Sequence, residues 1–273
     1  MAVAPASWPL TLEPGLREIF TTEALGRPES IRERLYGVRN SGKAQENYLG
    51  AGAFGLFPKF EGTLEYDDMS QGWLTTIANP EFAKGFYVRR KWVDDEQYGM
   101  INEMARGLGS AALRTAEEDA ADLFNKAFTS GTYRTGESNL GGDGVVLASA
   151  SHPRSPKDAA TQSNFTALSL SLDNWETVST AGAAITDDRG DKAGVRFDTI
   201  LVPRALRRTA IQMFGARALY EPGSAEFNTN PYAGEVEVIV WDRLTDTNAW
   251  FAIDSTLMRQ FLIWQDRIPL EFD

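Results

Sequence analysis

The chain has 273 residues, 42% of them hydrophobic, enough for one large domain or two closely joined small ones. Its formal net charge of -11 argues against a surface built to neutralise phosphates, because such binding needs clustered Lys and Arg. Cysteine is absent, which excludes disulfides, thiolate catalysis and cysteine-based metal sites. With no secretory signal pattern and no apolar run as long as a membrane span, we expect a soluble protein that stays in the cytosol.

The first fifty residues combine four prolines with short apolar patches such as GLREIF. Prolines at this density interrupt helices and strands, so the segment predicts an arm that lies across another surface instead of folding alone. For residues 1 to 10, a disordered terminus is an equally good interpretation.

Residues 54–93 contain two segments of β character, Thr63–Tyr66 and Gly85–Val93. Between them stand the turn formers Gly72, Asn79 and Pro80. We therefore predict a β-hairpin. An isolated hairpin is marginally stable in water, so this one should lean on another chain or on the body of the protein.

A long helix is predicted from about Asp94 to Phe128, because apolar or small residues recur there in steps of three and four. Asp94, Asp95 and Glu96 stand at its expected start, where carboxylates favour the positive end of the helix dipole. Gly107 and Gly109 leave a second interpretation open, in which two shorter helices replace the single rod.

The second half of the chain mixes strands and helices without a repeated βαβ unit, which predicts an α+β body. A helix is expected over Asp173–Ile185 with Asp173 as its cap, and another over RALRRTAIQMF. Strands are expected, in chain order, at VVLASASHP, VRFDTILVP, VEVIVW, NAWFAI and RQFLIW.

Few residues suggest a reaction or a bound group. His152 is the only histidine, and the serines of SASHP beside it in sequence seldom have the geometry of a catalytic triad. GGDG at 141–144 lacks the ending of a phosphate loop, and TDDRGD at 186–191 lacks the ligand spacing of a calcium loop. Both are interpreted as turns, the second a solvated one. The carboxylate pairs Asp67 with Asp68 and Glu117 with Glu118 are also expected to be solvated, so no catalytic residue, metal or cofactor is predicted.

The order of these features resembles the major head subunits of Mu-like tailed phages, from about GLREIF to NAWFAI. The most specific matches are SHP after a strand of small residues, and the strand, proline and helix of ILVPRALRRTA. The resemblance implies the Hong Kong 97-like capsid fold. It also implies a structural protein that assembles into the pentamers and hexamers of an icosahedral head around double-stranded DNA.

The resemblance implies a division of the chain. An N-terminal arm would span 1–53, an extended loop 54–93, the spine helix and peripheral domain 94–170, the axial domain 171–250, and a C-terminal return 251–273. The loop would reach over a neighbouring subunit, with its contacts carried by Trp73, Phe86, Arg89, Arg90, Lys91 and Trp92. Lys59 and Lys84 lie in the loop region, but no motif supports a crosslink through them.

The implied partners are further copies of the chain, a separate scaffold protein, a portal and a possible decoration protein. The DNA would be enclosed without sequence-specific binding, and the subunit would assemble in the host cytoplasm. Two alternatives stay open. One is an encapsulin shell around cargo enzymes, and the other is a hydrolase that uses His152.

Overall fold

The structure is a computed structural model, and it describes residues 12–25, 30–95, 97–215, 218–219 and 228–272. Glu96 of the expected acidic start, and residues 1–10, for which a disordered terminus is the alternative interpretation, lie outside the described residues. None of the described helices is both long enough and apolar enough to span a bilayer.

Helices and strands alternate irregularly along the chain, as expected for an α+β protein. Their order is α1 (Leu12–Leu25), α2 (Ile31–Leu35), β1 (Gly37–Asn40), β2 (Gln45–Ala51), β3 (Gln71–Ala78), α3 (Arg90–Asp94), α4 (Tyr98–Asn125), β4 (His152–Ser155), β5 (Asp158–Gln162), α5 (Leu172–Ala183), β6 (Thr199–Val202), η2 (Arg204–Leu206), α6 (Arg207–Phe214), β7 (Ala218–Leu219), β8 (Asn228–Thr229), β9 (Glu237–Val240), β10 (Phe251–Ile253), α7 (Ser255–Phe261) and β11 (Ile263–Asp266).

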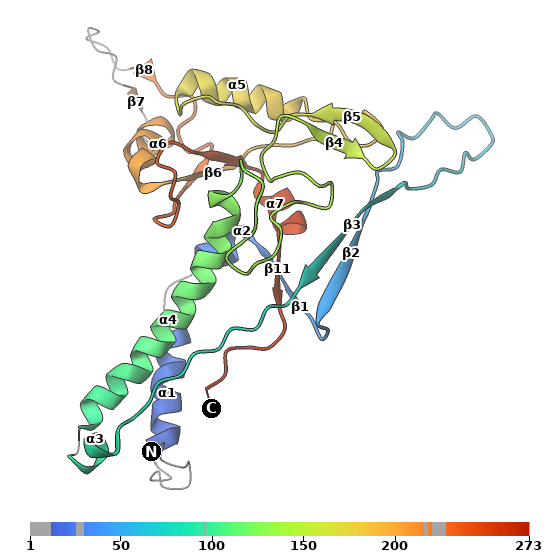
Figure 1. Cartoon of the computed structure of the whole chain (residues 1–273). Coiled ribbons are helices and arrows are strands. Elements are labelled where there is room, and N and C mark those ends of the chain that lie inside the picture. The colour runs from blue at the N-terminus through green and yellow to red at the C-terminus, as the bar shows by residue number, and fades with distance from the viewer. Residues whose placement is uncertain (1–11, 26–29, 96, 216–217, 220–227, 273) are drawn as a thin grey trace.

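The body is organised around a three-stranded sheet in the order β10-β6-β9. Strand β6 pairs in parallel with β9 and antiparallel with β10, and all four of its residues are buried. Because side chains alternate along a strand, Ile200 and Val202 join a core cluster with α5 and α6, whereas Leu201 joins a second cluster with α2 and α4. Both faces of this sheet are therefore covered by helices (Figure 1).

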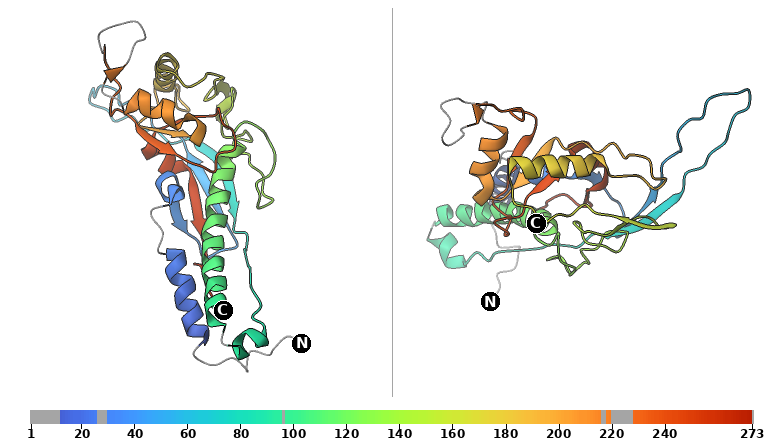
Figure 2. Two further views of the ribbon diagram at one scale, coloured as in Figure 1. Left: turned by 90° about the vertical axis from the view of Figure 1, so that its left-hand side faces the viewer. Right: turned by 90° about the horizontal axis from the view of Figure 1, so that it is seen from above.

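Helix α4 is one unbroken rod of 28 residues, which at about 1.5 Å per residue is about 42 Å long. The alternative of two shorter helices is wrong. Gly109 has a packing reason to be in the rod, because a Cβ atom there would lie 2.9 Å from the carbonyl oxygen of Phe20 in α1. The glycine lets the two helices lie close together along their length (Figure 2).

The arm does contribute to a core. Leu16 of α1 is buried with Ile101 and Ala105 of α4, and Phe20 and Ala24 are buried too. The prediction that the arm lies across another surface is confirmed for α1, although that surface is α4 of the same chain. The apolar face of α1 is thus covered within the same subunit.

Both predicted strands of the loop region are wrong. Thr63–Tyr66 forms no strand, and over Gly85–Val93 the chain runs extended to Arg89 and then enters the short helix α3. The hairpin pairs β2 with β3 instead, with Gln45 opposite Ala78 and Leu49 opposite Leu74. Residues 52–70 connect these strands as a long projection, drawn in blue to teal in Figure 1.

Three boundaries also differ from the sequence prediction. Asp94 closes α3 instead of opening the long helix, which begins after Gln97. Helix α5 is capped by Ser171, whose side chain accepts a hydrogen bond from the Asn174 amide, and not by Asp173. VVLASASHP is irregular up to Ser151, and only its end belongs to β4, which pairs with β5.

The remaining predictions for the body are largely confirmed. β6, β9 and β10 lie in VRFDTILVP, VEVIVW and NAWFAI, and α6 lies in RALRRTAIQMF. RQFLIW is divided between the end of α7 and the start of β11, which pairs in parallel with β1.

Candidate assembly surfaces

The projection formed by residues 52–70 carries large apolar side chains that the chain itself does not cover. Phe57 is 99% exposed, Tyr66 93% and Leu56 81%. The other exposed members of this set are Phe54, Phe60, Leu64 and Met69. We call these seven residues the apolar tip. Burying one such side chain stabilises a protein or complex by about 1.5–3 kcal/mol, so the tip is suited to contact with a protein surface.

Both limbs of the projection are bonded at their base to the turn that follows α5. The Asp188 carboxylate accepts a hydrogen bond from the Ala53 amide at 2.9 Å and another from the Ser70 hydroxyl. The bond from the Ala53 amide, aided by the one from Ser70, holds the pKa of Asp188 below its usual range. The carboxylate is therefore charged at neutral pH and joins the first limb to the second.

Arg189 makes a second set of bonds to the same two limbs. Its Nε donates to the Ala53 carbonyl oxygen at 2.8 Å, and its Nη2 donates to the Asp67 carboxylate at 2.9 Å and to the Asp68 carbonyl oxygen at 2.8 Å. Asp67 also accepts from the Gly55 amide at 2.9 Å. The Gly55 bond, followed by the one from Arg189, lowers the pKa of Asp67.

The TDDRGD segment is a turn, as predicted, with Gly190 at a φ of 92° and the Gly190 amide bonded to the Asp187 carbonyl. It is more than a solvated turn, because the side chains of Asp188 and Arg189 form hydrogen bonds with the projection. Asp67 is exposed, as predicted for a solvated carboxylate, and it is also hydrogen-bonded to Arg189. Glu117 and Glu118 are also engaged, with the Ser30 hydroxyl and the Arg243 guanidinium respectively.

The predicted contact residues are divided between two environments. Phe86 and Trp92 are half-buried and pack against the cluster that α1 and α4 form, so they support the chain's own rod. Arg89 lies over the Trp92 ring at 5.4 Å, and Arg90 pairs with Asp94 at 3.5 Å. Lys91 is exposed.

Trp73, the remaining predicted contact residue, belongs to β3 and is half-buried. The GGDG turn lies beside it, because a Cβ atom on Gly142 would be 3.1 Å from the Trp73 Cβ and would overlap the Thr75 hydroxyl. GGDG is a turn as predicted, with Gly144 at a φ of 76°. Gly142 allows the turn to pack closely on β3, and Gly144 supplies the positive φ of the turn.

His152 is paired with a carboxylate and not with a serine. Its Nδ1 lies 2.6 Å from Asp143, and over the described part of the chain its buried Nε2 has no hydrogen-bond partner. The Ser149 hydroxyl instead accepts from the Ser151 amide. Among the described residues, no group of three or more His, Asp or Glu side chains is arranged to hold a metal ion.

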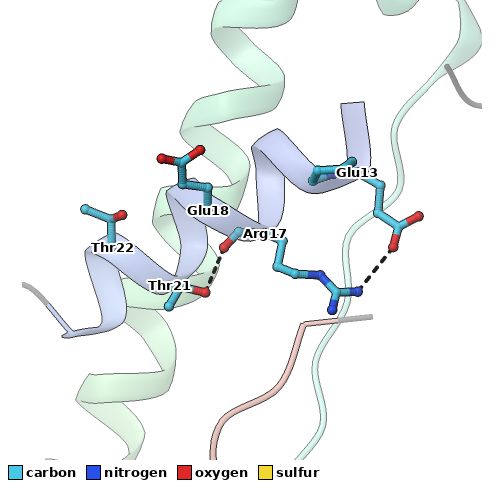
Figure 3. A pocket seen from close by; sticks show the side chains of 6 residues that line it. Glu13, Arg17, Glu18, Thr21 and Thr22 are labelled. Carbon is cyan, nitrogen blue, oxygen red and sulfur yellow. Dashed lines mark hydrogen bonds and ion pairs between the residues drawn. The ribbon is translucent and has the colours of Figure 1, made fainter. Parts of the chain in front are cut away.

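A hollow of about 430 Å³ lies on the outer side of α1 (Figure 3). Its lining residues are Glu13, Pro14, Arg17, Glu18, Thr21 and Thr22. Arg17 pairs with Glu13 at 3.2 Å, and the Thr21 hydroxyl donates to the Arg17 carbonyl oxygen. These are the ordinary pairs of an exposed helix, and the hollow offers no reactive group.

Comparison with known proteins assigns the chain to a family. A sequence model of the phage capsid protein family matches residues 74–271. The chain belongs to this family, as its sequence resemblance to phage head subunits indicates, and it is a structural, major capsid protein of a bacteriophage. No curated protein matches the sequence.

Solved structures support the same assignment at the level of the fold. The capsid of bacteriophage JBD30 is 18% identical and matches with a TM-score of 0.61 over 82% of this chain and 94% of that chain. The procapsid of the same phage matches with a TM-score of 0.58 at 18% identity, over 89% of this chain and 100% of that one. A JBD30 capsid decorated with minor capsid protein trimers also matches, with a TM-score of 0.56. The chain thus shares a mixed helix and strand capsid fold.

Proposed function

We propose that the chain has the Hong Kong 97-like fold and builds the hexamers and pentamers of an icosahedral head around double-stranded DNA. The observation that carries this proposal is the apolar tip. Its large side chains project from the body and are not covered by the rest of the described chain. A second copy of the chain is the natural partner, because a shell repeats one heterologous contact until it closes. Each subunit engages several neighbours, so modest contacts add up.

We propose the same division of the chain that the resemblance implies, with one change. The spine with the peripheral domain, the axial domain and the C-terminal return keep the bounds 94–170, 171–250 and 251–273, whereas the arm is shortened to 1–44. The extended loop would include the paired strands, so that its functional unit runs from β2 to β3. The long unbroken α4 supports the spine assignment, and the parallel pairing of β6 with β9 within 171–250 supports the axial one.

The contact with the neighbour would combine two surfaces. The apolar tip would supply most of the stabilisation, because Leu56, Phe57 and Tyr66 are almost wholly exposed in the single subunit. Arg89, Arg90 and Lys91 would pair with acidic side chains of the neighbour, for which the net charge of -11 provides many candidates. Trp73, Phe86 and Trp92 would support these surfaces from behind.

Other partners are proposed by likeness to the head of JBD30, for which a procapsid and a form decorated with minor capsid protein trimers are known. We expect a scaffold protein, a portal and a decoration protein, and assembly in the host cytoplasm. The acidic chain favours packaging without tight DNA binding, because like charge keeps the wall from holding the genome.

Negative-stain microscopy of the purified protein, alone and with a scaffold protein coexpressed, tests this proposal. Closed shells, or rings of five and six, are expected. A strictly monomeric protein at every concentration and salt would contradict it. A copurifying cargo enzyme would favour an encapsulin instead, and ester hydrolysis that is lost in His152→Ala would favour a hydrolase. No observation on the chain favours either alternative.

A further inference from the structure

The projection depends on one turn for its bonds to the body. Over the described residues, the hydrogen bonds that join 53–69 to the rest of the chain all go to Asp188 and Arg189. Within the projection itself, Asp67 holds the Gly55 amide, and the Gly52 amide donates to the Ser70 carbonyl. Beyond the paired strands, the direction of the apolar tip is therefore set by two side chains of a distant segment.

The glycines of the projection fit closely around those two side chains. A Cβ atom on Gly52 would overlap the Asp188 carboxylate and the Ser70 hydroxyl. A Cβ atom on Gly55 would lie 3.2 Å from an Arg189 guanidinium nitrogen and 3.3 Å from the Asp67 carboxylate. Because glycine has no side chain, these two positions leave room for the hydrogen bonds between the projection and the turn, and a larger residue would crowd the bonded side chains.

The turn is itself fixed by hydrogen bonds on the side away from the projection, so its bonds to the projection can fix the angle of the projection. The Asp187 carboxylate accepts from the Arg189 amide at 2.9 Å and from the Asp191 amide at 3.0 Å. Thr186 exchanges hydrogen bonds with the side chain of Gln162 in β5. The β4–β5 hairpin, which reaches toward the start of the projection in Figure 1, therefore supports the turn from behind.

We propose that Asp188 and Arg189 are positioning residues for assembly, which fix the angle at which the extended loop leaves the body. Charge-assisted hydrogen bonds are stronger and more directional than neutral ones, and here they bind both limbs at once. A loop fixed in this way presents the apolar tip at one place relative to the body, which lowers the entropy lost when a neighbour is met. The role in assembly rests on the proposed function, whereas the bracing of the loop does not.

The test measures the loop angle directly in a subunit kept dilute and unassembled. Because the chain has no cysteine, Lys59→Cys on the projection and Thr180→Cys on α5 place two spin labels uniquely, and pulsed electron spin resonance gives their distance distribution. The test variant is Asp188→Ala with Arg189→Ala. Its matched control is Asp191→Ala with Lys192→Ala, which removes the same two charges from the same turn but no side-chain bond to the projection.

We expect one narrow distance distribution in the parent and the control, and a broad, displaced one in the test variant. Assembly of the test variant, followed by light scattering, should be lost at concentrations where the control still forms shells. If the test variant misfolds by circular dichroism, Asp67→Ala with Ser70→Ala removes bonds from the loop side and leaves the turn intact. The same broadening and the same loss of assembly are expected there.

Two outcomes would overturn the inference. One is an unchanged narrow distribution in the folded variants. The other is a broadened distribution with assembly equal to that of the control, because the angle would then have no role. Failure of the proposed function is a different result, in which the parent itself forms no shells while the distance distributions still change as expected.

Discussion

Trp175 in α5 and Phe57 in the apolar tip are both large aromatic residues, yet Trp175 is 2% exposed and Phe57 99%. Trp175 packs against Phe214 with ring centroids 4.9 Å apart and has Phe197 and Trp250 at 6.4 Å. Phe57 has no comparable neighbour among the described residues. The difference teaches that apolar area serves two purposes in this chain. In the body it stabilises the fold, whereas in the projection it stays exposed to solvent and, under the proposed function, is the surface that another copy would cover.

The largest expected effect lies in the body. Trp175→Ala should lower the free energy of unfolding by about 3–5 kcal/mol, because it leaves a cavity among three other aromatic rings. This is a large part of the stability of an ordinary domain. Urea unfolding followed by tryptophan fluorescence and circular dichroism measures it. Thr180→Ala on the exposed face of the same helix is the control, and equal midpoints for the two variants would contradict the assignment.

A smaller effect, of a different kind, is expected from the loop. Phe57→Ser should leave the unfolding free energy within about 0.5 kcal/mol of the parent, because the side chain is already in water. Assembly should weaken by about 1.5–3 kcal/mol for each contact between subunits, through lost apolar burial. The concentration at which shells first appear, measured by light scattering, should rise tenfold or more. Lys59→Ser, also on the projection, serves as the control.

The comparison between the body and the projection can be sharpened in the segment between β3 and α4, which contains Arg89 and Arg90. Arg89→Glu with Arg90→Glu should change stability by about 1 kcal/mol or less, because the Arg90–Asp94 pair is exposed and such pairs contribute little. Assembly should weaken most at low salt, where charge pairing between subunits is least screened. Assembly thresholds at two salt concentrations measure this. A loss that is the same at both would exclude pairing with acidic partner side chains.

Much of the body could be predicted from the sequence because its signals are local. The steps of three and four in α4, and the continuous apolar run of β6 between a polar turn and a proline, each arise within a few residues. The surroundings of the predicted assembly residues were predicted less well. Phe86 and Trp92 alternate as they would in a strand, but alternation alone supplies no paired neighbour, and these side chains pack on α1 and α4 instead.

The position of the hairpin could not be predicted for a physical reason. Gly72 resembles a turn former, yet it lies inside β3, where a Cβ atom would be 2.8 Å from the backbone of Gly50 on β2. Two glycines on paired strands allow the two backbones to approach closely. From composition alone, such a glycine cannot be distinguished from one that forms a turn. The bonds of Asp188 and Arg189 to the loop were hidden for another reason, since they join segments more than a hundred residues apart.

The smallest effect concerns pH, and it again separates the loop from the body. Hydrogen bonds lower the pKa values of Asp67 and Asp188 in the folded chain, so their contribution is fully present above the unfolded value of about 3.9. It is lost as the pH falls through the lower, folded values. The distance distribution between the spin labels should therefore stay narrow from about pH 8 to about pH 5 and broaden only below about pH 4. In Asp67→Asn with Asp188→Asn, which has no carboxylate to protonate at these positions, the distribution should not respond to pH over the range in which the body stays folded. Broadening of the parent already near pH 6, far above the range in which these carboxylates take up protons, would show that the carboxylates of the turn and the projection do not control the angle of the loop.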